Sequence, residues 1–352
     1  MDRAPAGLPE IAHRVEERVI ELLDAETERW RATDVALVEP LDAIRSLVVA
    51  GGKRLRPVFC HWGFVGAGGD PSDPRVVDAG AAFELLQAFA LIHDDVMDGS
   101  ATRRGAPAVH RRFLERHDAE GWTGESRRFG EGVAILAGDL ALVYSDLLLP
   151  AAPSAPIALA ALWHELRIEL NVGQYLDLAG TATGGIDREG ARRIARMKSG
   201  RYTIERPLQM GALLAGSAEI AGALSSYGDP LGEAFQLRDD VLGVWGASER
   251  TGKPAGDDLR EGKPTLLLAV ATERVDDVGR SLLANVGRRD LGDDDVAALQ
   301  QLLRDTGALD VVEAEIAARH AEAVANLDAI DIPEAADRAL RELADFVVAR
   351  DA

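Results

Sequence analysis

Cysteine is almost absent from this chain: among 352 residues, only Cys60 carries a thiol. One cysteine excludes an internal disulfide framework and a zinc site built from several thiolates. Long apolar runs are lacking as well. The most apolar stretch, around residues 134–163, is interrupted by Asp139, Asp146 and several prolines, so it falls short of the roughly 20 residues of a membrane span. We therefore expect no membrane span.

Positive charge is scarce: 39 Lys and Arg stand against 59 Asp and Glu, which gives a net charge of −20. Such an excess of negative charge argues against extensive contact with nucleic-acid phosphates. Residues 1–14 contain no basic segment followed by an apolar run, so we expect no signal peptide. With 47% hydrophobic residues and a single cysteine, the composition indicates a globular, cytoplasmic protein.

Lysine is the rarest of the charged residues, because 35 of the 39 basic residues are arginine. A chain that uses arginine almost everywhere keeps lysine where a compact ammonium group on a flexible stem is needed, unless the survivors are there by chance. All four lie in glycine-rich or polar segments near other charged residues, which favours function over chance. They are Lys53, Lys198, Lys253 and Lys263.

Apolar residues recur every three to four positions through most of the chain, which is typical of amphipathic helices. The first such stripe consists of Ile11, Val15, Val19, Leu22 and Leu23. Similar stripes run over residues 75–98, 131–149, 155–178, 187–215, 218–243, 264–275 and 309–350.

No convincing series of alternating strands is present, so we predict an all-α protein with one large helical domain over residues 1–352. The segment at about 117–130 is rich in glycine, serine and charge, and is predicted to be a surface loop. Gly228-Asp229-Pro230 is predicted to separate two helices.

Three aspartates end an apolar helical segment. Asp94 and Asp98 are one helical turn apart, and Asp95 lies beside them. Carboxylates at the negative end of a helix dipole repel one another unless a cation holds them, and hard oxygen ligands suit magnesium. A solvated acidic helix end is the alternative, but it does not explain the apolar turns that precede it. The cluster therefore predicts a magnesium site.

A second acidic pair, Asp239-Asp240, follows another apolar helical segment. Alone it is weak evidence, because a solvated helix face would look the same. Together with the first cluster it suggests two helix ends that face one cavity, with metal ions bridging them.

Basic residues lie close to these acids in the sequence. Lys53 and Arg56 are three positions apart at a predicted helix start, which favours binding of an anion, usually phosphate. Arg103-Arg104 follows the first acidic cluster after a short turn, and Lys253 and Lys263 follow the second. Metal-bridged acids, several cations and apolar helices together predict a substrate with a diphosphate head and a hydrocarbon tail.

The sequence resembles the polyprenyl synthetase family, the trans-isoprenyl diphosphate synthases. The matching segments keep the family's order: Gly51–Pro57, Glu84–Gly105, Gly138-Asp139, Gly173-Gln174, Lys198-Ser199, Phe235–Asp240 and Gly252–Thr265. The resemblance implies a single helical bundle around a deep central cavity, usually a homodimer. It also implies head-to-tail condensation of isopentenyl diphosphate with an allylic diphosphate such as dimethylallyl, geranyl or farnesyl diphosphate.

The resemblance also implies roles for single residues. Asp94 and Asp98, supported by Asp95, would hold two Mg²⁺ ions, and Asp239 with its neighbour Asp240 would hold a third. The allylic diphosphate would be bound by Arg103, Lys198 and Lys253. Isopentenyl diphosphate would be bound by Lys53, Arg56, Gln87 and Arg104. The allylic cation would be flanked by Ser199 and Gln236, and a closing loop from Lys253 to Lys263 would exclude water.

The chain departs from the family pattern at the end of the second acidic motif, where Gly243 stands in place of a third aspartate. We expect activity to be retained, with weaker metal binding. Two other readings stay open. A terpene cyclase would lack the site at Lys53 and Arg56, and a non-catalytic regulatory subunit would have no reason to keep the other ligands.

Product length is expected to depend on the helix before the first acidic cluster. On a helical wheel Ala90 and Phe83 line up below Asp94, whereas Phe89 lies to the side. Leu86, on the same helix, is a further candidate for setting product length. In the family, however, an aromatic five positions before the first aspartate is typical of geranylgeranyl diphosphate synthases. We predict a C20 product, with farnesyl diphosphate (C15) as the alternative.

Overall fold

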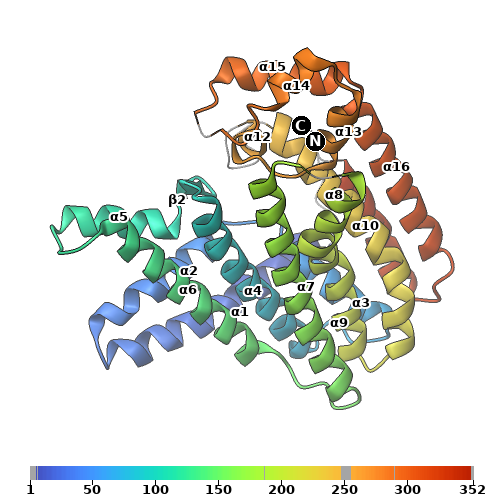
Figure 1. Cartoon of the computed structure of the whole chain (residues 1–352). Helices are drawn as coiled ribbons and strands as arrows, with labels where there is room; N and C mark the ends of the chain where they lie inside the picture. Colours follow the sequence, from blue (N-terminus) through green and yellow to red (C-terminus); the bar gives the residue numbers. More distant parts are fainter. Residues whose placement is uncertain (1–4, 6, 186, 247–254, 289, 350–352) are drawn as a thin grey trace. The chain divides into compact units, whose positions relative to one another are not determined.

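Helices form nearly all the regular structure in a computed structural model of the chain, which describes residues 5, 7–185, 187–246, 255–288 and 290–349 (Figure 1). Within these residues the only strands are β1 (Thr102–Arg103) and β2 (Ala106–Pro107), which pair antiparallel in a small hairpin. The predicted all-α class is confirmed.

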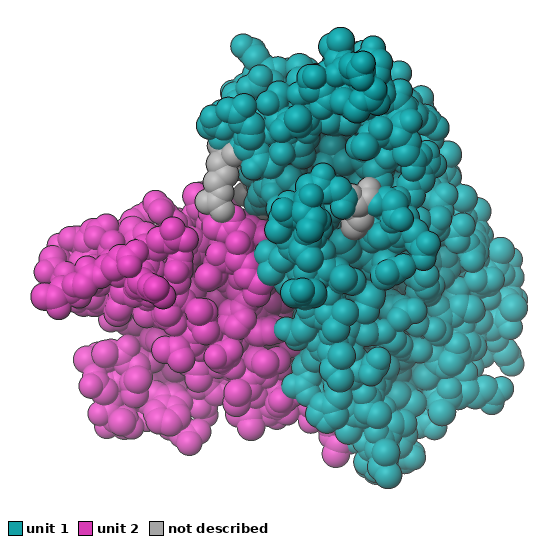
Figure 2. Space-filling model, viewed as in Figure 1, with its two compact units in different colours: residues 1–5, 62–69, 152–352 teal, residues 6–61, 70–151 magenta. Residues whose placement is uncertain are grey.

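The chain divides into two compact units (Figure 2). Unit 1 comprises residues 1–5, 62–69 and 152–352, and unit 2 comprises residues 6–61 and 70–151. Helix α3 (Leu55–Gly66) contributes to both. The expectation of one domain around a central cavity stays a prediction.

Unit 2 is built around α4 (Pro74–Asp98), which packs against α1 and α6. By length and composition α4 is the one helix among the described residues that could cross a membrane, but 67% of its most apolar window is buried. It is therefore a core helix, and the prediction that residues 134–163 are the most apolar stretch was wrong. Around it lie α1 (Leu8–Arg31), the short 3₁₀ helix η1 (Val35–Leu37), α2 (Val38–Val49), α5 (Val109–Ala119) and α6 (Ser126–Leu148).

The stripe predicted on α1 faces the core of unit 2. Ile11, Val15, Val19 and Leu23 are buried. Leu22 is half-buried.

The predicted loop at 117–130 is wrong at both ends, because α5 runs to Ala119 and α6 already begins at Ser126. Aromatic packing explains the difference. Phe129, in the first turns of α6, has its ring centroid 5.4 Å from that of His117 and 5.2 Å from that of Trp122. This cluster orders a segment whose composition is that of a loop.

Unit 1 contains the longest helices, α7 (Pro156–Thr183) and α10 (Ala218–Trp245). Between them lie α8 (Arg188–Ile194), the π-helix η2 (Ala195–Glu205) and α9 (Arg206–Leu214). The chain continues with α12 (Asp257–Glu261), α13 (Leu266–Arg274), α14 (Asp277–Leu283), α15 (Asp293–Asp305), α16 (Ala308–Leu327) and α17 (Glu334–Val348).

Helix α10 runs through Pro230, so the predicted break at 228–230 was wrong. A proline leaves the carbonyl four residues earlier without its helical donor. Here that carbonyl, on Ser226, accepts a hydrogen bond of 2.7 Å from Nδ2 of Asn326 on α16. The tertiary contact replaces the missing bond and the helix continues.

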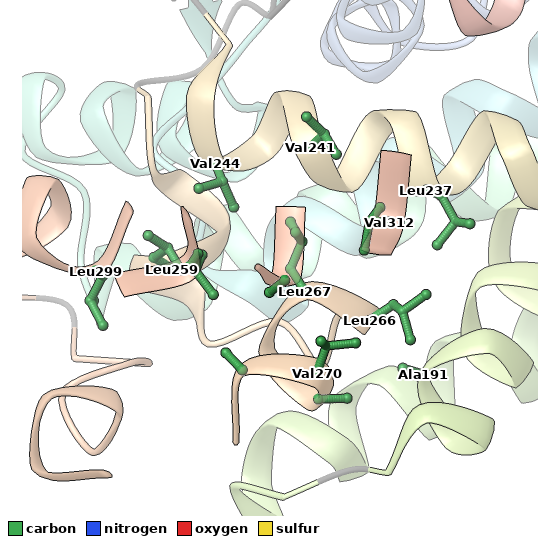
Figure 3. Packing of buried hydrophobic residues seen from close by; sticks show 14 of the residues in the cluster. Ala191, Leu237, Val241, Val244, Leu259, Leu266, Leu267, Val270, Leu299 and Val312 are labelled. Atoms are coloured by element: carbon green, nitrogen blue, oxygen red, sulfur yellow. The ribbon is translucent and has the colours of Figure 1, made fainter. Parts of the chain in front are cut away.

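An apolar cluster joins α10 to the helices that follow it (Figure 3). Burial of such side chains is worth about 1.5–3 kcal/mol each. The cluster fixes the position of the short helix α12 against α10. Its labelled members are Ala191, Leu237, Val241, Val244, Leu259, Leu266, Leu267, Val270, Leu299 and Val312.

Candidate functional site

Unit 2 places the first acidic cluster in the last turn of α4. Asp95 is buried, whereas Asp94 and Asp98 are half-buried. The helix ends at Gly99 in a left-handed conformation (φ 65°), and this glycine turns the chain toward the β1–β2 hairpin. The acids therefore lie at the negative end of a long helix, where carboxylates need nearby positive charge.

Part of that positive charge comes from the hairpin. Arg103, on β1, donates from Nε to Oδ1 of Asp95 at 2.8 Å, and its Nη2 lies 3.6 Å from Oδ2 of Asp94. The hairpin turn consists of Arg104 (φ 53°) and Gly105 (φ 76°), the conformation typical of tight hairpins. The structure thus brings Arg103 to the first acidic cluster; that it binds the allylic diphosphate stays a prediction.

The segment before α3 is held by a buried arginine that the sequence reasoning missed. Arg54 donates from Nη2 to Oε2 of Glu16 at 2.7 Å and to the carbonyl of Val48 at 2.6 Å, and from Nη1 to Glu84. Burial alone would lower the pKa of Arg54, but the charges and hydrogen bonds of Glu84 and Glu16 outweigh it and raise the pKa. Arg54 anchors the segment that carries Lys53.

Lys53 and Arg56 do not share a helical face as predicted, because α3 begins only at Leu55. Before the helix, Gly51 and Gly52 both have positive φ angles, of 96° and 152°. Lys53 is therefore an exposed residue of the entry segment, while Arg56 is half-buried in the first turn.

Arg104 reaches this entry segment from the hairpin. It donates from Nη1 to the carbonyl of Leu47 at 2.7 Å, and a Cβ on Gly52 would lie only 2.8 Å from its Nη2. Burial lowers the pKa of Arg104 to about 10; Glu84 opposes this shift, and repulsion from Arg54, Arg103 and Arg56 adds to it. Three neighbouring arginines thus repel Arg104, and a bound anion would relieve that repulsion.

Gln87 lies on α4 two turns before the first acidic cluster. Its Oε1 is buried and accepts no hydrogen bond from the residues that the structure describes. A buried polar atom of this kind is satisfied by water or by a ligand.

The proposed chain-length residues all lie on α4. Phe83, Leu86 and Phe89 are buried, and Ala90 is half-buried. The Phe89 ring packs edge-on against His93 with centroids 4.7 Å apart.

His93 is itself confined by α6. Its Nε2 donates to the carbonyl of Ile135 at 3.0 Å, and a Cβ on Gly138 would lie 2.3 Å from its ring. The absence of a side chain at Gly138 therefore makes room for His93, which braces Phe89.

Unit 1 carries Lys198 and Ser199 on the π-helix η2. π-Helical turns are rare and often occur at functional sites. Lys198 donates from Nζ to Oδ2 of the buried Asp177 on α7 at 2.6 Å. The sequence reasoning missed Asp177; its spacing of one turn from Gly173, in a matched family segment, was the available signal.

Glycines let η2 fit between α7 and α10. A Cβ on Gly173 would lie 2.5 Å from the backbone nitrogen of Lys198, and a Cβ on Gly232 would lie 2.6 Å from the carbonyl oxygen of Gly200. Both contacts are with backbone, which cannot give way like a side chain. The position of Lys198 therefore depends on these close approaches.

On α10, Gln236 donates from Nε2 to Oδ1 of Asp240 at 2.7 Å. The dipole role of Gln236 stays a prediction. Burial, and next the charge of Asp258, raises the pKa of Asp240 well above its ordinary value. Asp239 is half-buried.

Two of the lysines that were predicted to belong to the site follow α10 in the sequence. Lys263 places Nζ 3.1 Å from Oδ1 of Asp258, a buried acid on α12 that the sequence reasoning did not single out. Lys253 lies outside the described residues.

The acids present fit magnesium that arrives with its substrate. Across the described ranges, no three His, Cys, Asp or Glu side chains converge to hold a metal ion by themselves. Mg²⁺ is usually bound by one or two carboxylates, with water and substrate phosphates completing the octahedron. Asp94 and Asp98 in unit 2, and Asp239 in unit 1, supply ligands of that kind.

Comparison with known proteins adds a family. The Polyprenyl synthetase model matches residues 39–303. The structure is similar to geranylgeranyl pyrophosphate synthase from Corynebacterium glutamicum complexed with isoprenyl diphosphate and magnesium, with a TM-score of 0.93 and 39% identity, over 98% of this chain and 99% of that chain.

Two relatives show how product names vary among similar sequences. Geranylfarnesyl diphosphate synthase of Aeropyrum pernix is 33% identical over 76% of this chain and 80% of its own length. (2E,6E)-Farnesyl diphosphate synthase of Mycobacterium tuberculosis is 32% identical over 86% of this chain and 80% of its own length.

Proposed function

Because the chain belongs to the polyprenyl synthetase family and is a prenyltransferase, we propose that it makes geranylgeranyl diphosphate, a C20 product. It would do so by head-to-tail condensation of isopentenyl diphosphate with an allylic diphosphate. The observation that carries the product length is the braced ring of Phe89.

A side chain stops chain growth only if it cannot swing aside. Phe89 is buried and packs against His93, which is held by the Ile135 carbonyl and fills the space beside Gly138. Five positions separate Phe89 from Asp94 on α4. A rigid aromatic at this level supports a short-chain product.

The allylic diphosphate would be bound through the carboxylates of Asp94, Asp98 and Asp239 and the cations of Arg103 and Lys198. Asp177 fixes the Lys198 ammonium by its hydrogen bond of 2.6 Å. Magnesium held by these carboxylates, as three ions in this proposal, would supply Lewis acidity toward the departing diphosphate. That both units serve one diphosphate stays a prediction.

Isopentenyl diphosphate would occupy the cationic site of unit 2, formed by Lys53, Arg56, Gln87 and Arg104. The pKa of Arg104, lowered to about 10 by burial and by its arginine neighbours, supports this assignment because a bound anion would relieve their repulsion.

Ser199 and Gln236 would stabilise the allylic cation with their oxygen dipoles. The allylic C–O bond would break with its electron pair leaving on the diphosphate. The isopentenyl double bond would then attack the resulting cation, a carbon–carbon bond would form, and a proton would be lost to the released diphosphate. Exclusion of water by the segment from Lys253 to Lys263 would protect the cation from quenching.

We also propose that the enzyme is a cytoplasmic homodimer. Exposed large apolar residues form a stripe on α7, where Ile157, Ile168, Val172 and Tyr175 are 85%, 56%, 41% and 69% exposed. A second stripe on α6 consists of Leu136, Val143 and Leu147. Exposed apolar stripes of this kind are typical of surfaces that bind another copy.

Product analysis tests the proposal. Purified protein with Mg²⁺, isopentenyl diphosphate and each allylic diphosphate in turn should give C20 as its longest major product on chromatography. Phe89→Ala should lengthen it by one or more isoprene units, because the obstruction is removed. A C15 product from the unaltered protein would instead support the farnesyl alternative.

Phe83→Ala is the matched variant, because it removes the same ring two turns deeper on α4. Longer products from Phe83→Ala alone would assign the obstruction to Phe83. Unchanged products in both variants would show that another helix forms the floor.

A further inference from the structure

Gly243 occupies the position where the second acidic motif lacks its third aspartate. It lies on α10 four residues after Asp239, so a side chain there would lie on the same helical face. Its backbone has no positive φ, so helix geometry does not require glycine at this position. The reason for glycine must be the space around it.

That space is taken by a carboxylate from another helix. A Cβ on Gly243 would lie 1.9 Å from Oδ2, 2.4 Å from Cγ and 3.0 Å from Oδ1 of Asp258. Real Cβ atoms do not approach other heavy atoms below 3.0 Å. The carboxyl group of Asp258 therefore lies where the side chain of a third aspartate would begin.

Asp258 is held in place from several directions. Its neighbour Leu259 is 1% exposed and belongs to the apolar cluster that joins α12 to α10 (Figure 3). The backbone nitrogen of Lys263 donates to the Asp258 carbonyl at 3.0 Å, and the Lys263 ammonium lies 3.1 Å from Oδ1. The carboxylate is thus fixed by packing and by charge.

We propose that Asp258 supplies, from α12, the third carboxylate that the second acidic motif lacks at Gly243. It would add its charge to those of Asp239 and Asp240 toward a divalent cation with bound diphosphate, and it would hold Lys263 beside them. This inference rests on the proposed function. It explains the glycine and the buried acid together.

Metal binding tests the proposal without turnover. Isothermal titration of Mn²⁺ in the presence of inorganic diphosphate should show affinity about tenfold weaker for Asp258→Asn than for the unaltered protein, the scale expected for a supporting metal-site acid. Asp293→Asn is the matched control, because it removes the same charge from an exposed side chain that contacts α12 through Arg260 at 2.8 Å. It should leave the affinity unchanged.

Moving the carboxylate gives the decisive variant. Gly243→Asp alone should weaken Mn²⁺ binding, because its side chain collides with Asp258. Gly243→Asp combined with Asp258→Ala should restore the affinity to within about threefold of the unaltered protein. If Asp258→Asn does not fold, this double variant still tests the proposal. A folded double variant that does not recover Mn²⁺ affinity would overturn the proposal.

Asp239→Asn separates this inference from the proposed function. Loss of Mn²⁺ affinity in Asp239→Asn but not in Asp258→Asn would overturn the role of Asp258 and leave the proposed function intact. Unchanged affinity in both would refute the second metal motif, and the role of Asp258 with it.

Discussion

At the scale of single residues, the chemistry of the proposed site depends on which cation stands at each position. Arg54 is a buried anchor with three acceptors, whereas Lys53, its neighbour, is exposed. Guanidinium forks suit the first role and a compact ammonium suits the second. The two adjacent positive charges are therefore not interchangeable.

Lys53→Arg should be damaging although it keeps the charge. We expect KM for isopentenyl diphosphate to rise about tenfold, a loss of about 1.4 kcal/mol of binding free energy, because a guanidinium is bulkier and differently directed. Steady-state kinetics with each substrate varied would measure this. Arg338→Lys on α17, an exposed residue paired with Glu334, is the control and should leave KM unchanged. Normal kinetics in Lys53→Arg would mean that the scarcity of lysine carries no functional information.

His61 predicts a pH dependence of stability. Burial, and next the charge of Arg14, lowers the pKa of His61 from 6.5 to about 4. Between these values the unfolded chain binds a proton that the folded chain does not, so stability falls as the pH falls from 6.5 to about 4.

The expected contribution of His61 over that window is about 3 kcal/mol. Urea unfolding at several pH values would measure it. His61→Gln should flatten the dependence, while His13→Gln, at an exposed position, should not. Identical profiles for the unaltered protein and His61→Gln would contradict the assignment.

At the scale of secondary-structure elements, the π-helix η2 forms ion pairs with both of its neighbours, α7 and α10. Arg201 donates from Nη1 to Oε1 of Glu169 on α7 at 2.7 Å, and Arg196 donates from Nη2 to Oδ2 of Asp229 on α10 at 2.6 Å. Burial tends to raise the pKa of Glu169, but Arg206 and Arg201 outweigh it and lower the pKa. These ion pairs and the glycine contacts together fix the helix that carries Lys198.

Gly232→Ala should disturb η2 directly. The new Cβ would meet the carbonyl oxygen of Gly200 at 2.6 Å, and overpacking of this kind costs about 1–3 kcal/mol of stability. We expect a lower melting temperature and a reduced kcat, because Lys198 lies two residues from Gly200.

The control substitution is available on the same helix. Gly222→Ala places its Cβ in open space and should raise stability by about 0.5–1 kcal/mol. Calorimetry of both variants decides between the two effects. Equal stability changes in Gly222→Ala and Gly232→Ala would show that the Gly200–Gly232 contact does not matter.

The spacing of apolar residues correctly predicted the helices that depend only on their own sequence. The 3.6-residue period located α1 and α4, and the last turn of α4 carries Asp94 and Asp98 as expected. The period could not show that α10 continues through Pro230, because that depends on Asn326, about a hundred residues later.

The same limit applies to the candidate site. Motifs located Lys198 and Asp239, and they pointed to the segments that contain or adjoin Asp177 and Asp258. They could not show that these two acids contact Lys198 and the space at Gly243, because both contacts join helices distant in sequence. A π-helix likewise has no periodic signature in a segment of eleven residues. Pairing between remote segments is set by packing, which one sequence does not display.

At the scale of the whole molecule, a chain with net charge −20 needs apolar surface to associate with its own copies. In the proposed dimer, the exposed stripes on α6 and α7 would provide it. Leu147→Glu and Ile168→Glu, placed at positions 63% and 56% exposed, should convert the proposed dimer to a monomer.

Sedimentation velocity would measure this change in mass. Val278→Glu on α14 is the matched control, because Val278 is 77% exposed but lies outside both stripes, and it should leave the dimer intact. A monomeric unaltered protein, or dimers in both stripe variants, would contradict the proposed interface.

The contact between Gly243 and Asp258 also constrains which substitutions these two positions can accept. If an acid were introduced at position 243 by one substitution, two side chains would compete for one space. If Asp258 alone were replaced, neither position would carry an acid. Each single step is therefore expected to be worse than either end point. The two positions are therefore expected to tolerate exchange of the carboxylate only when both are changed together.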